Sequence, residues 1–351
     1  MVTACTVTSV SSRGLDVVRL TAPQGAQATV ALDGATLLAW RSRLPLGAPG
    51  PAGRLEPTGS VWPAEPADPI ELVDGYRDAA ELHGQEGVRS GVMAPFVNRI
   101  ADGRYDFDGR RHDLLPGVPA GRRTTYHGFL RLLRTTLAQA STTSSSATVR
   151  LTASIRPDTA EGYPFALDVE VRYTLGAASL ALEITARNAG PEPAPYAAGW
   201  HPYFTLGTGP VDDLELSVPA VTVVRTRDLL PLPGPAALEP VTRRPDLDFR
   251  LPRPIGGHRL DVAFAGLVPD DDGWSTTLLR NPATGAQLRI RQPNGLLHVF
   301  TGDTLARDRR ASIALEPVEV MTDAFNRPDC RSRITLAPGQ ARTFRCAVEV
   351  G

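Results

Sequence analysis

Apolar and polar residues alternate along four separate segments of the chain. In residues 167–175, "LDVEVRYTL", every odd position is apolar and the positions between them are Asp, Glu, Arg and Thr. Residues 149–155, 180–186 and 344–350 have the same period of two. Because successive side chains of a strand point to opposite faces, this pattern predicts β-strands with one buried face and one solvated face.

Turn-forming residues lie between such runs. Asp108-Gly109 separates two short runs in "RYDFDGRRHDL", and a turn with Pro and Gly separates two more in "LLRNPATGAQLRI". The low-complexity "STTSSS" of residues 141–146 lies between two strand-like runs and reads as a hairpin loop. Short connections of this kind predict antiparallel pairing.

Helical periodicity is not sustained over three turns anywhere, and 32 Pro and 32 Gly interrupt the chain too often for long helices. The prediction is therefore an all-β fold of antiparallel sheets with few short helices. The Pro- and Gly-rich residues 47–69 are expected to form a long surface loop over a sheet edge or a cleft. Neither a repeat nor a shift in composition marks a boundary, so residues 1–351 are expected to form a single domain.

Charge and composition narrow the possible partners and compartments. A formal net charge of −1 provides no positive excess for nucleic acid or an anionic membrane. The sequence contains no run of roughly 18 apolar residues, and its start does not resemble a signal peptide, so we expect a cytoplasmic protein without a membrane span. Three cysteines without a CxxC pair favour a reducing compartment.

Several classes of chemistry lack the residues they need. All 37 basic residues are arginine, so a lysine Schiff base, a pyridoxal phosphate anchor and a Walker-type phosphate loop are excluded. The six histidines show no HxH or HxxxH pair, so we expect no metal. Neither a GxSxG elbow nor a dinucleotide-binding glycine motif occurs, and we expect no cofactor. Acid–base chemistry remains.

Two residues stand out as candidates for it. His201 is a single imidazole among apolar and aromatic side chains in "AGWHPYFTL", which fits either a proton carrier or a packed core histidine. Glu316 in "ALEPVEV" follows an apolar run and precedes a proline, so we expect it to end a strand and to face a cavity or the surface. Glu319 is a similar carboxylate three residues later, and the residues alone do not choose between them.

The chain resembles the aldose 1-epimerase (galactose mutarotase) family from about Asp33 to the C-terminus. The resemblance rests on nine motifs in the family's order: "PFVNRIADGRYDFDGRRHDL", "YHGFLR", "GYPFALDVEVRYTL", "ITARNAG", "YAAGWHPYFTLG", "LDVAF", "FTGD", "LEPVEVMTDAFN" and "LAPGQ". It implies a galactose mutarotase-like β-supersandwich with an open cleft, a sugar substrate and no cofactor.

The resemblance also implies roles for individual residues. His201 corresponds to the general acid that protonates the sugar ring oxygen, and Glu316 to the base that takes the proton of the anomeric hydroxyl. The implied substrate-binding residues are Asn98, Arg99, His127 and Asp261. Attraction between opposite charges should then lower the pKa of Glu316 and raise that of His201.

Some segments depart from the family pattern. Tyr126 in "TTYHG" and residues 318–323 differ from the usual motifs, which leaves the identity of the sugar open. His83 in "HGQEG" matches no shared motif and is expected to lie in a loop. Two alternatives remain. One is a family member that acts on another substrate, such as a sugar phosphate or a biosynthetic intermediate, and the other is a non-catalytic sugar-binding protein. We expect the protein to be a monomer or a homodimer.

Overall fold

The structure is a computed structural model that describes residues 4–43, 68–207 and 209–351. Within these residues the chain forms three large sheets, and the named strand pairs in them are antiparallel. The all-β prediction is confirmed. Of the loop predicted for residues 47–69, all but residues 68 and 69 lies outside the described part of the chain.

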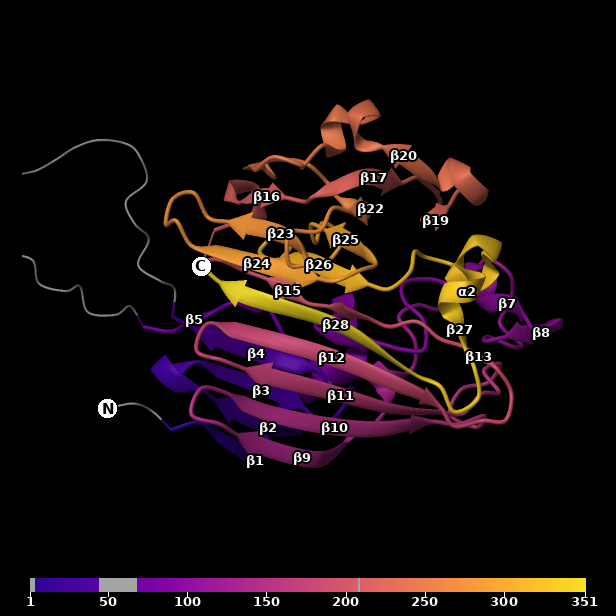
Figure 1. Ribbon diagram of the computed structural model, residues 1–351, viewed down its shortest axis with the longest axis horizontal. Helices are drawn as coiled ribbons and strands as arrows, with labels where there is room; N and C mark the ends of the chain where they lie inside the picture. Colours follow the sequence, from indigo (N-terminus) through magenta and orange to yellow (C-terminus); the bar gives the residue numbers. More distant parts are fainter. Residues whose placement is uncertain (1–3, 44–67, 208) are drawn as a thin grey trace, which may run out of the picture.

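A nine-stranded sheet extends across the front of the molecule (Figure 1). Its strands, in spatial order, are β21 (Arg253–Pro254), β16 (Glu215–Ser217), β23 (Ser275–Arg280), β24 (Gln287–Gln292), β28 (Ala341–Val350), β12 (Ser179–Asn188), β11 (Leu167–Leu175), β10 (Ala147–Ile155) and β9 (Thr136–Thr142). The four alternating segments are the neighbouring strands β28, β12, β11 and β10, so these predictions are confirmed.

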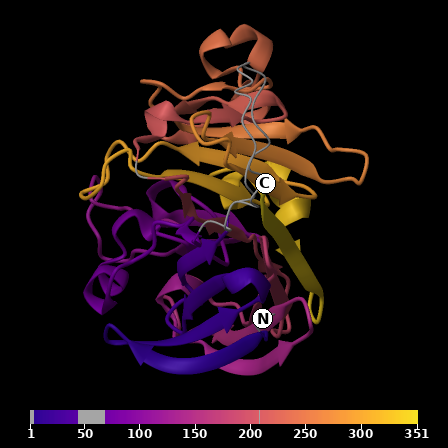
Figure 2. The same ribbon diagram turned by 90° about the vertical axis from the view of Figure 1, so that its left-hand side faces the viewer.

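Two further sheets lie behind this one, one in the lower and one in the upper half of the views (Figures 1 and 2). The five-stranded sheet contains β1 (Thr6–Ser12), β2 (Leu15–Thr21), β3 (Gln27–Ala31), β4 (Leu37–Ser42) and β5 (Ile70–Glu71). The eight-stranded sheet contains β20 (Leu238–Pro240), β17 (Ala220–Val224), β22 (Asp261–Leu267), β25 (Leu296–Phe300), β26 (Ile313–Val318), β14 (Gly199–His201), β6 (Gly91–Met93) and β15 (Tyr203–Phe204).

The predicted hairpins are also present. β7 (Arg104–Phe107) and β8 (Arg110–Asp113) are joined by Asp108 and Gly109, both with positive φ, as a two-residue turn of this type requires. β23 pairs with β24 across the turn with Pro and Gly. Of the loop predicted for residues 141–146, residues 143–146 connect β9 to β10, while 141 and 142 end β9. The remaining two-stranded ribbons are β13 (Ala194–Pro195) with β27 (Thr335–Leu336) and β18 (Thr226–Arg227) with β19 (Leu230–Pro231).

Helices are short throughout the described residues. The α-helices there are α1 (Ala79–Gly84) and α2 (Arg331–Ile334), and none has the length and apolar character needed to cross a membrane. His83 belongs to α1, so the prediction of a loop at this position is wrong. The side chain of Asp78 caps this helix by accepting a hydrogen bond from the backbone N–H of Glu81.

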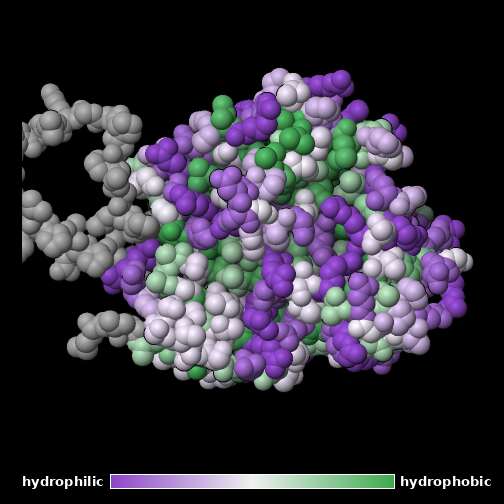
Figure 3. Space-filling model, in the orientation of Figure 1, coloured by the Kyte–Doolittle hydropathy of each residue, from purple (hydrophilic) through white to green (hydrophobic). Residues whose placement is uncertain are grey.

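Inward side chains of the three sheets form one continuous apolar core. It includes Val30 of the five-stranded sheet, Ile184 of the nine-stranded sheet and Leu315 of the eight-stranded sheet. The outer face of the nine-stranded sheet carries the polar partners of the alternating pattern, seen as purple and pale areas in Figure 3. The eight-stranded sheet likewise packs one face against this core, and its other face points away from the core.

The alternation in β12 predicts that substitutions at two neighbouring residues will change the free energy of unfolding by very different amounts. Ile184 is fully buried and Thr185 lies on the outer face. We expect Ile184→Ala to lower the free energy of unfolding by about 2–5 kcal/mol through a cavity in the core. Thr185→Ala, the control, should cost about 1 kcal/mol or less. Urea unfolding followed by tryptophan fluorescence measures both, and equal effects would contradict the assigned register.

Candidate active site

A cavity of about 330 Å³ opens on the free face of the eight-stranded sheet. Its volume lies at the lower end of the usual range for small-molecule sites. Six of its lining residues are those named from the sequence: Asn98, Arg99, His127, His201, Asp261 and Glu316. The rest of the wall includes Glu86, Tyr126, Tyr203, His298, Phe300 and Leu305. The fold thus brings together residues that are up to 218 positions apart.

His201 is the last residue of β14, and its imidazole is packed on several sides. The ring stacks on Tyr203 with centroids 5.1 Å apart, and the ring of His127 meets it edge-on at 5.0 Å. Nε2 lies 3.3 Å from Oε1 of Glu316. Nδ1 is buried and has no hydrogen-bond partner among the described residues. Within the described part of the chain, Glu316 is therefore the polar side chain that the imidazole contacts.

Glu316 lies inside β26 rather than at its end, so the prediction of a strand-end carboxylate is wrong. The strand continues through Pro317, which faces Leu297 of β25, to Val318. Every residue of β26 is buried, and the side chain of Glu316 is only 3% exposed. Oε2 finds no hydrogen-bond partner within the described chain. The carboxyl group thus combines deep burial at the cavity with one oxygen that no described residue hydrogen-bonds.

Glycine geometry positions the loop that carries His127. Gly128 has φ +67°, and a Cβ at this residue would lie 2.1 Å from the backbone oxygen of Ala94. The close approach lets the backbone N–H of His127 donate to the backbone oxygen of Asn98 at 2.8 Å. Nδ1 of His127 lies 2.7 Å from Sδ of Met93. "YHG" therefore needs its glycine to fix the imidazole over the cavity.

Arg99 contributes a guanidinium without an ion-pair partner in the described chain. It lies over the ring of Tyr126, with Cζ 5.8 Å from the ring centroid. The backbones of the two residues form an isolated antiparallel bridge. Stacking on Tyr126 orients the planar group and leaves its N–H donors available for a ligand.

Asp261 is not isolated, because it binds a histidine that sequence reasoning did not select. Oδ1 of Asp261 lies 2.8 Å from Nε2 of His298 on the neighbouring strand β25. His298 faces Glu316 across the β25–β26 pair. The available signal was a single histidine in the apolar run "GLLHVF", the same kind of signal that singled out His201.

Burial, rather than charge attraction, dominates the protonation of the central pair, so the predicted directions are wrong. Burial raises the pKa of Glu316 to about 8, against the opposing charges of His298 and Arg99. Burial, and then the charge of His298, lower the pKa of His201 to about 3. His127 is also held neutral, since burial and the charge of His201 place its pKa well below the usual value. Each shift follows from the cost of moving a charge out of water.

The pair of Asp261 and His298 behaves differently. Burial opposes the charging of His298, but Glu316 and the hydrogen bond to Asp261 outweigh it and raise the pKa of His298. Burial likewise opposes ionisation of Asp261, while His298 lowers its pKa overall. Because the Asp261 side chain is 45% exposed, water supports this ion pair. Among Asp261, His298, Glu316 and His201, charge is thus favoured on Asp261 and His298.

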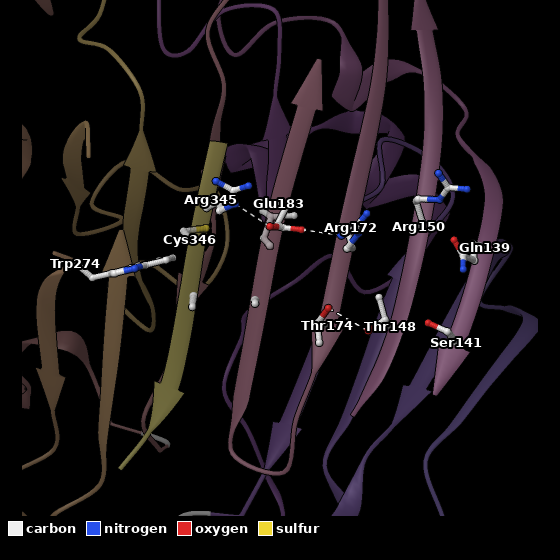
Figure 4. Close-up of a pocket in the computed structure, with 13 residues that line it drawn as sticks. Gln139, Ser141, Thr148, Arg150, Arg172, Thr174, Glu183, Trp274, Arg345 and Cys346 are labelled. Atoms are coloured by element: carbon white, nitrogen blue, oxygen red, sulfur yellow. Dashed lines mark hydrogen bonds and ion pairs between the residues drawn. The ribbon is translucent and has the colours of Figure 1, made fainter. Parts of the chain in front are cut away.

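A larger depression of about 600 Å³ lies on the outer face of the nine-stranded sheet (Figure 4). Its polar side chains bind one another: Arg172 donates to Glu183 at 3.1 Å, and Arg345 donates to the same carboxylate at 2.9 Å. Thr148 and Thr174 are also paired, at 3.1 Å. Because these charged and hydroxyl groups are paired with one another, they offer a ligand less than the unpaired groups of the smaller cavity do.

The other sequence candidates lie elsewhere. Glu319 accepts a hydrogen bond from the backbone N–H of Ala198 at 2.7 Å and lies 3.4 Å from Arg342, so it supports the chain and does not line the cavity. His83 is exposed on α1, with Nε2 3.7 Å from Asp33. The cysteines at 5, 330 and 346 are all free. Within the described residues, no group of three His, Cys, Asp or Glu is arranged to hold a metal ion.

Similarity to known proteins identifies the family of the chain. The family model described as aldose 1-epimerase matches residues 60–349. The chain belongs to the aldose 1-epimerase family. It is 30% identical to the uncharacterised protein YihR of Escherichia coli, over 67% of this chain and 71% of that protein. It is 28% identical to galactose mutarotase of Rattus norvegicus, over 74% and 79% of the two chains.

The fold is shared with solved structures of the family. A galactose 1-epimerase from Lactobacillus acidophilus superposes with a TM-score of 0.75 at 16% identity, covering 99% of each chain. The galactose mutarotase-like fold of the chain is therefore confirmed.

Titration of the protein without substrate tests the two central shifts. Because burial favours the neutral carboxyl group, the side-chain carbon of Glu316 should titrate near pH 8, and His201 should stay neutral down to about pH 3. Carbon-13 and nitrogen-15 NMR with labelled Glu and His measures both, with Glu316→Gln to assign the carboxyl signal. A Glu316 midpoint in the usual range of surface glutamates would contradict the assignment.

Proposed function

We propose that this protein is an aldose 1-epimerase that interconverts the α and β anomers of a free aldose. The observation that carries the proposal is the buried pair of His201 and Glu316, 3.3 Å apart in a cavity lined by hydroxyl-binding groups. Ring opening of a cyclic hemiacetal requires one proton acceptor at the anomeric hydroxyl and one proton donor at the ring oxygen. This pair supplies both.

The reaction then proceeds in three steps. Glu316 accepts the proton of the C1 hydroxyl, the C1–O1 bond becomes a carbonyl, the bond between C1 and the ring oxygen breaks, and His201 gives its proton to that oxygen. The open aldehyde rotates about the C1–C2 bond. Closure from the other carbonyl face returns the ring-oxygen proton to His201 and the Glu316 proton to O1. Every transfer is a proton transfer, so the chemistry itself requires no cofactor.

The proton inventory of the pair fits this scheme. One proton remains on the pair between the two apparent values of about 3 and about 8, which belong to the pair as a unit. In the free protein this proton rests on Glu316, and the reactive form, with the proton on His201 and a carboxylate at Glu316, is the minor one. Moving the proton across the 3.3 Å separation leaves the total charge of the pair unchanged.

Sugar binding is assigned to the polar groups around the pair. The fork of Arg99 suits two neighbouring hydroxyls, Asp261 can accept from a hydroxyl through its free oxygen, and Asn98 and His127 line the same wall. The ring of Phe300 adds an apolar surface for sugar C–H groups. Relatives named galactose mutarotase and galactose 1-epimerase support a hexose. A single-domain cytoplasmic enzyme, monomeric or homodimeric, completes the proposal.

Replacement of the base tests the proposal directly. Glu316→Gln retains the shape and removes the basicity, so we expect kcat to fall by ~10²-fold or more in a folded protein. Polarimetry of freshly dissolved α-galactose and α-glucose, with and without protein, measures the rate. Glu319→Gln is the matched control, because this half-buried glutamate binds the backbone N–H of Ala198, does not line the cavity and should leave the rate near that of wild type. A folded Glu316→Gln protein with wild-type activity would exclude Glu316 as the base.

Arg99→Lys tests recognition by the guanidinium fork. Lysine keeps the charge but cannot make two parallel hydrogen bonds, so kcat/KM should fall by roughly tenfold or more, mainly through KM. Arg331→Lys is the control, since Arg331 stacks on Phe107 away from the cavity and should leave kcat/KM unchanged. If Arg99→Lys has wild-type kinetics, Arg99 does not contact the sugar.

A further inference from the structure

Three neighbouring strands place titratable side chains in one row across the sheet. His298 of β25 faces Glu316 of β26. On the other side of β26, Gly199 faces Val318 and Tyr203 faces Ala314, so the same register places His201 opposite Glu316. Residues directly opposite one another share a face of the sheet. Glu316 therefore lies between two imidazoles, one on each neighbouring strand.

The row of titratable side chains ends on both sides at small residues without polar side chains. Ala263 of β22 follows His298, and Gly91 of β6 follows His201. Both residues are small and carry no polar side chain. In the row itself, charge can therefore reside on His298, Glu316 and His201. The second partner of His298, Asp261, lies diagonally on β22 with Oδ1 2.8 Å from Nε2.

We propose that His298, held as an imidazolium by Asp261, is a positioning residue that stabilises the carboxylate form of Glu316 and so eases transfer of the shared proton from Glu316 to His201 during the reaction. This inference rests on the proposed function, because it concerns the proton that the reaction uses. His298 acts through Glu316 and does not have to touch the sugar.

The charge of His298 acts more strongly on Glu316 than on His201, because Glu316 is nearer. Adjacent strands are about 4.8 Å apart, so His298 is one strand from Glu316 and two strands, roughly 10 Å, from His201. Coulomb interactions weaken with distance, so the charge of His298 favours the carboxylate more than it disfavours an imidazolium at His201. The pKa directions agree: His298 lowers the pKa of both residues, while its own pKa is raised by Glu316 and Asp261 against burial.

Five other titratable or charged groups face the row. They come from the loop and strand segments packed against the cavity and are Glu86, Arg89, Arg99, His127 and Asp261. Arg99 favours the Glu316 carboxylate in the same direction as His298. Arg89, fully buried behind the Tyr203 ring at 5.2 Å, disfavours an imidazolium at His201. Unlike these five residues, His298 lies directly opposite Glu316 on the neighbouring strand β25.

The first test needs no substrate and no activity. Nitrogen-15 NMR of histidine-labelled wild type should show His298 charged at pH 7, while His201 and His127 are neutral. In His298→Gln, whose amide can still donate to Asp261, the carboxyl midpoint of Glu316 should move upward by about one pH unit. A neutral His298 at pH 7, or an unmoved Glu316 midpoint, would overturn the proposal.

The second test uses the pH profile of mutarotation. In His298→Gln we expect kcat at pH 7 to fall about tenfold with KM within about twofold, because the hydrogen bond to Asp261 remains. The alkaline limb should move to higher pH by about one unit, since the pair holds its proton more tightly once the cation is removed. A purely structural role would lower kcat without moving the limb, and that result would contradict the inference.

His83→Gln is the matched control, because His83 also lies beside an aspartate but on the exposed helix α1. It should leave kcat, KM and both limbs of the pH profile unchanged.

The proposed function and the inference about His298 are refuted by different results. A wild type without mutarotase activity would refute the proposed function, whereas the NMR measurements would still decide the position of the charge.

Discussion

The burial of Glu316 between two imidazoles is the constraint on which the site depends. A carboxylate moved out of water costs several kcal/mol unless nearby groups compensate for the lost hydration. Here the compensation comes from strand register, since His298 and His201 occupy the positions opposite Glu316 on both neighbouring strands. A slip of β26 by one residue would turn Glu316 into the apolar core and expose Leu315 to the cavity. Correct pairing of β26 is therefore a condition for both the core and the site.

In the nine-stranded sheet, by contrast, the charged side chains of the exposed face bind one another. On its outer face the arginines and carboxylates satisfy each other, as Arg172 does between Glu170 and Glu183. In a chain without lysine, the planar arginine fork can bridge two acidic residues on adjacent strands. On the cavity side of the eight-stranded sheet, the guanidinium of Arg99 has no ion-pair partner, and Oε2 of Glu316 no hydrogen-bond partner, among the described residues. The difference between the two faces lies in unused hydrogen-bonding groups, and not in the size of the depression.

Sequence reasoning succeeded where the signal is local and failed where it depends on neighbouring strands. β10, β11, β12 and β28 alternate because each has one wet face, and the turn at Asp108 and Gly109 needs positive φ. β26 is buried on both faces, so it shows no alternation, and the proline after Glu316 was misread as its end. Helix α1 has six residues, too few for a helical period to appear. The roles assigned to the six site residues came from family resemblance and are proposals.

The largest error in the sequence-based view, the direction of the two pKa shifts, shows how the site is organised. Attraction between charges was expected to dominate, but both members of the deepest pair favour their neutral forms. Charge is located where Asp261 is 45% exposed and water remains available, while the 3%-exposed Glu316 shares one proton with His201. A proton that moves within such a pair changes the local field without changing the net charge of the buried region. Little solvent reorganisation is then needed at the moment of reaction, which is the condition under which preorganised groups stabilise a transition state best.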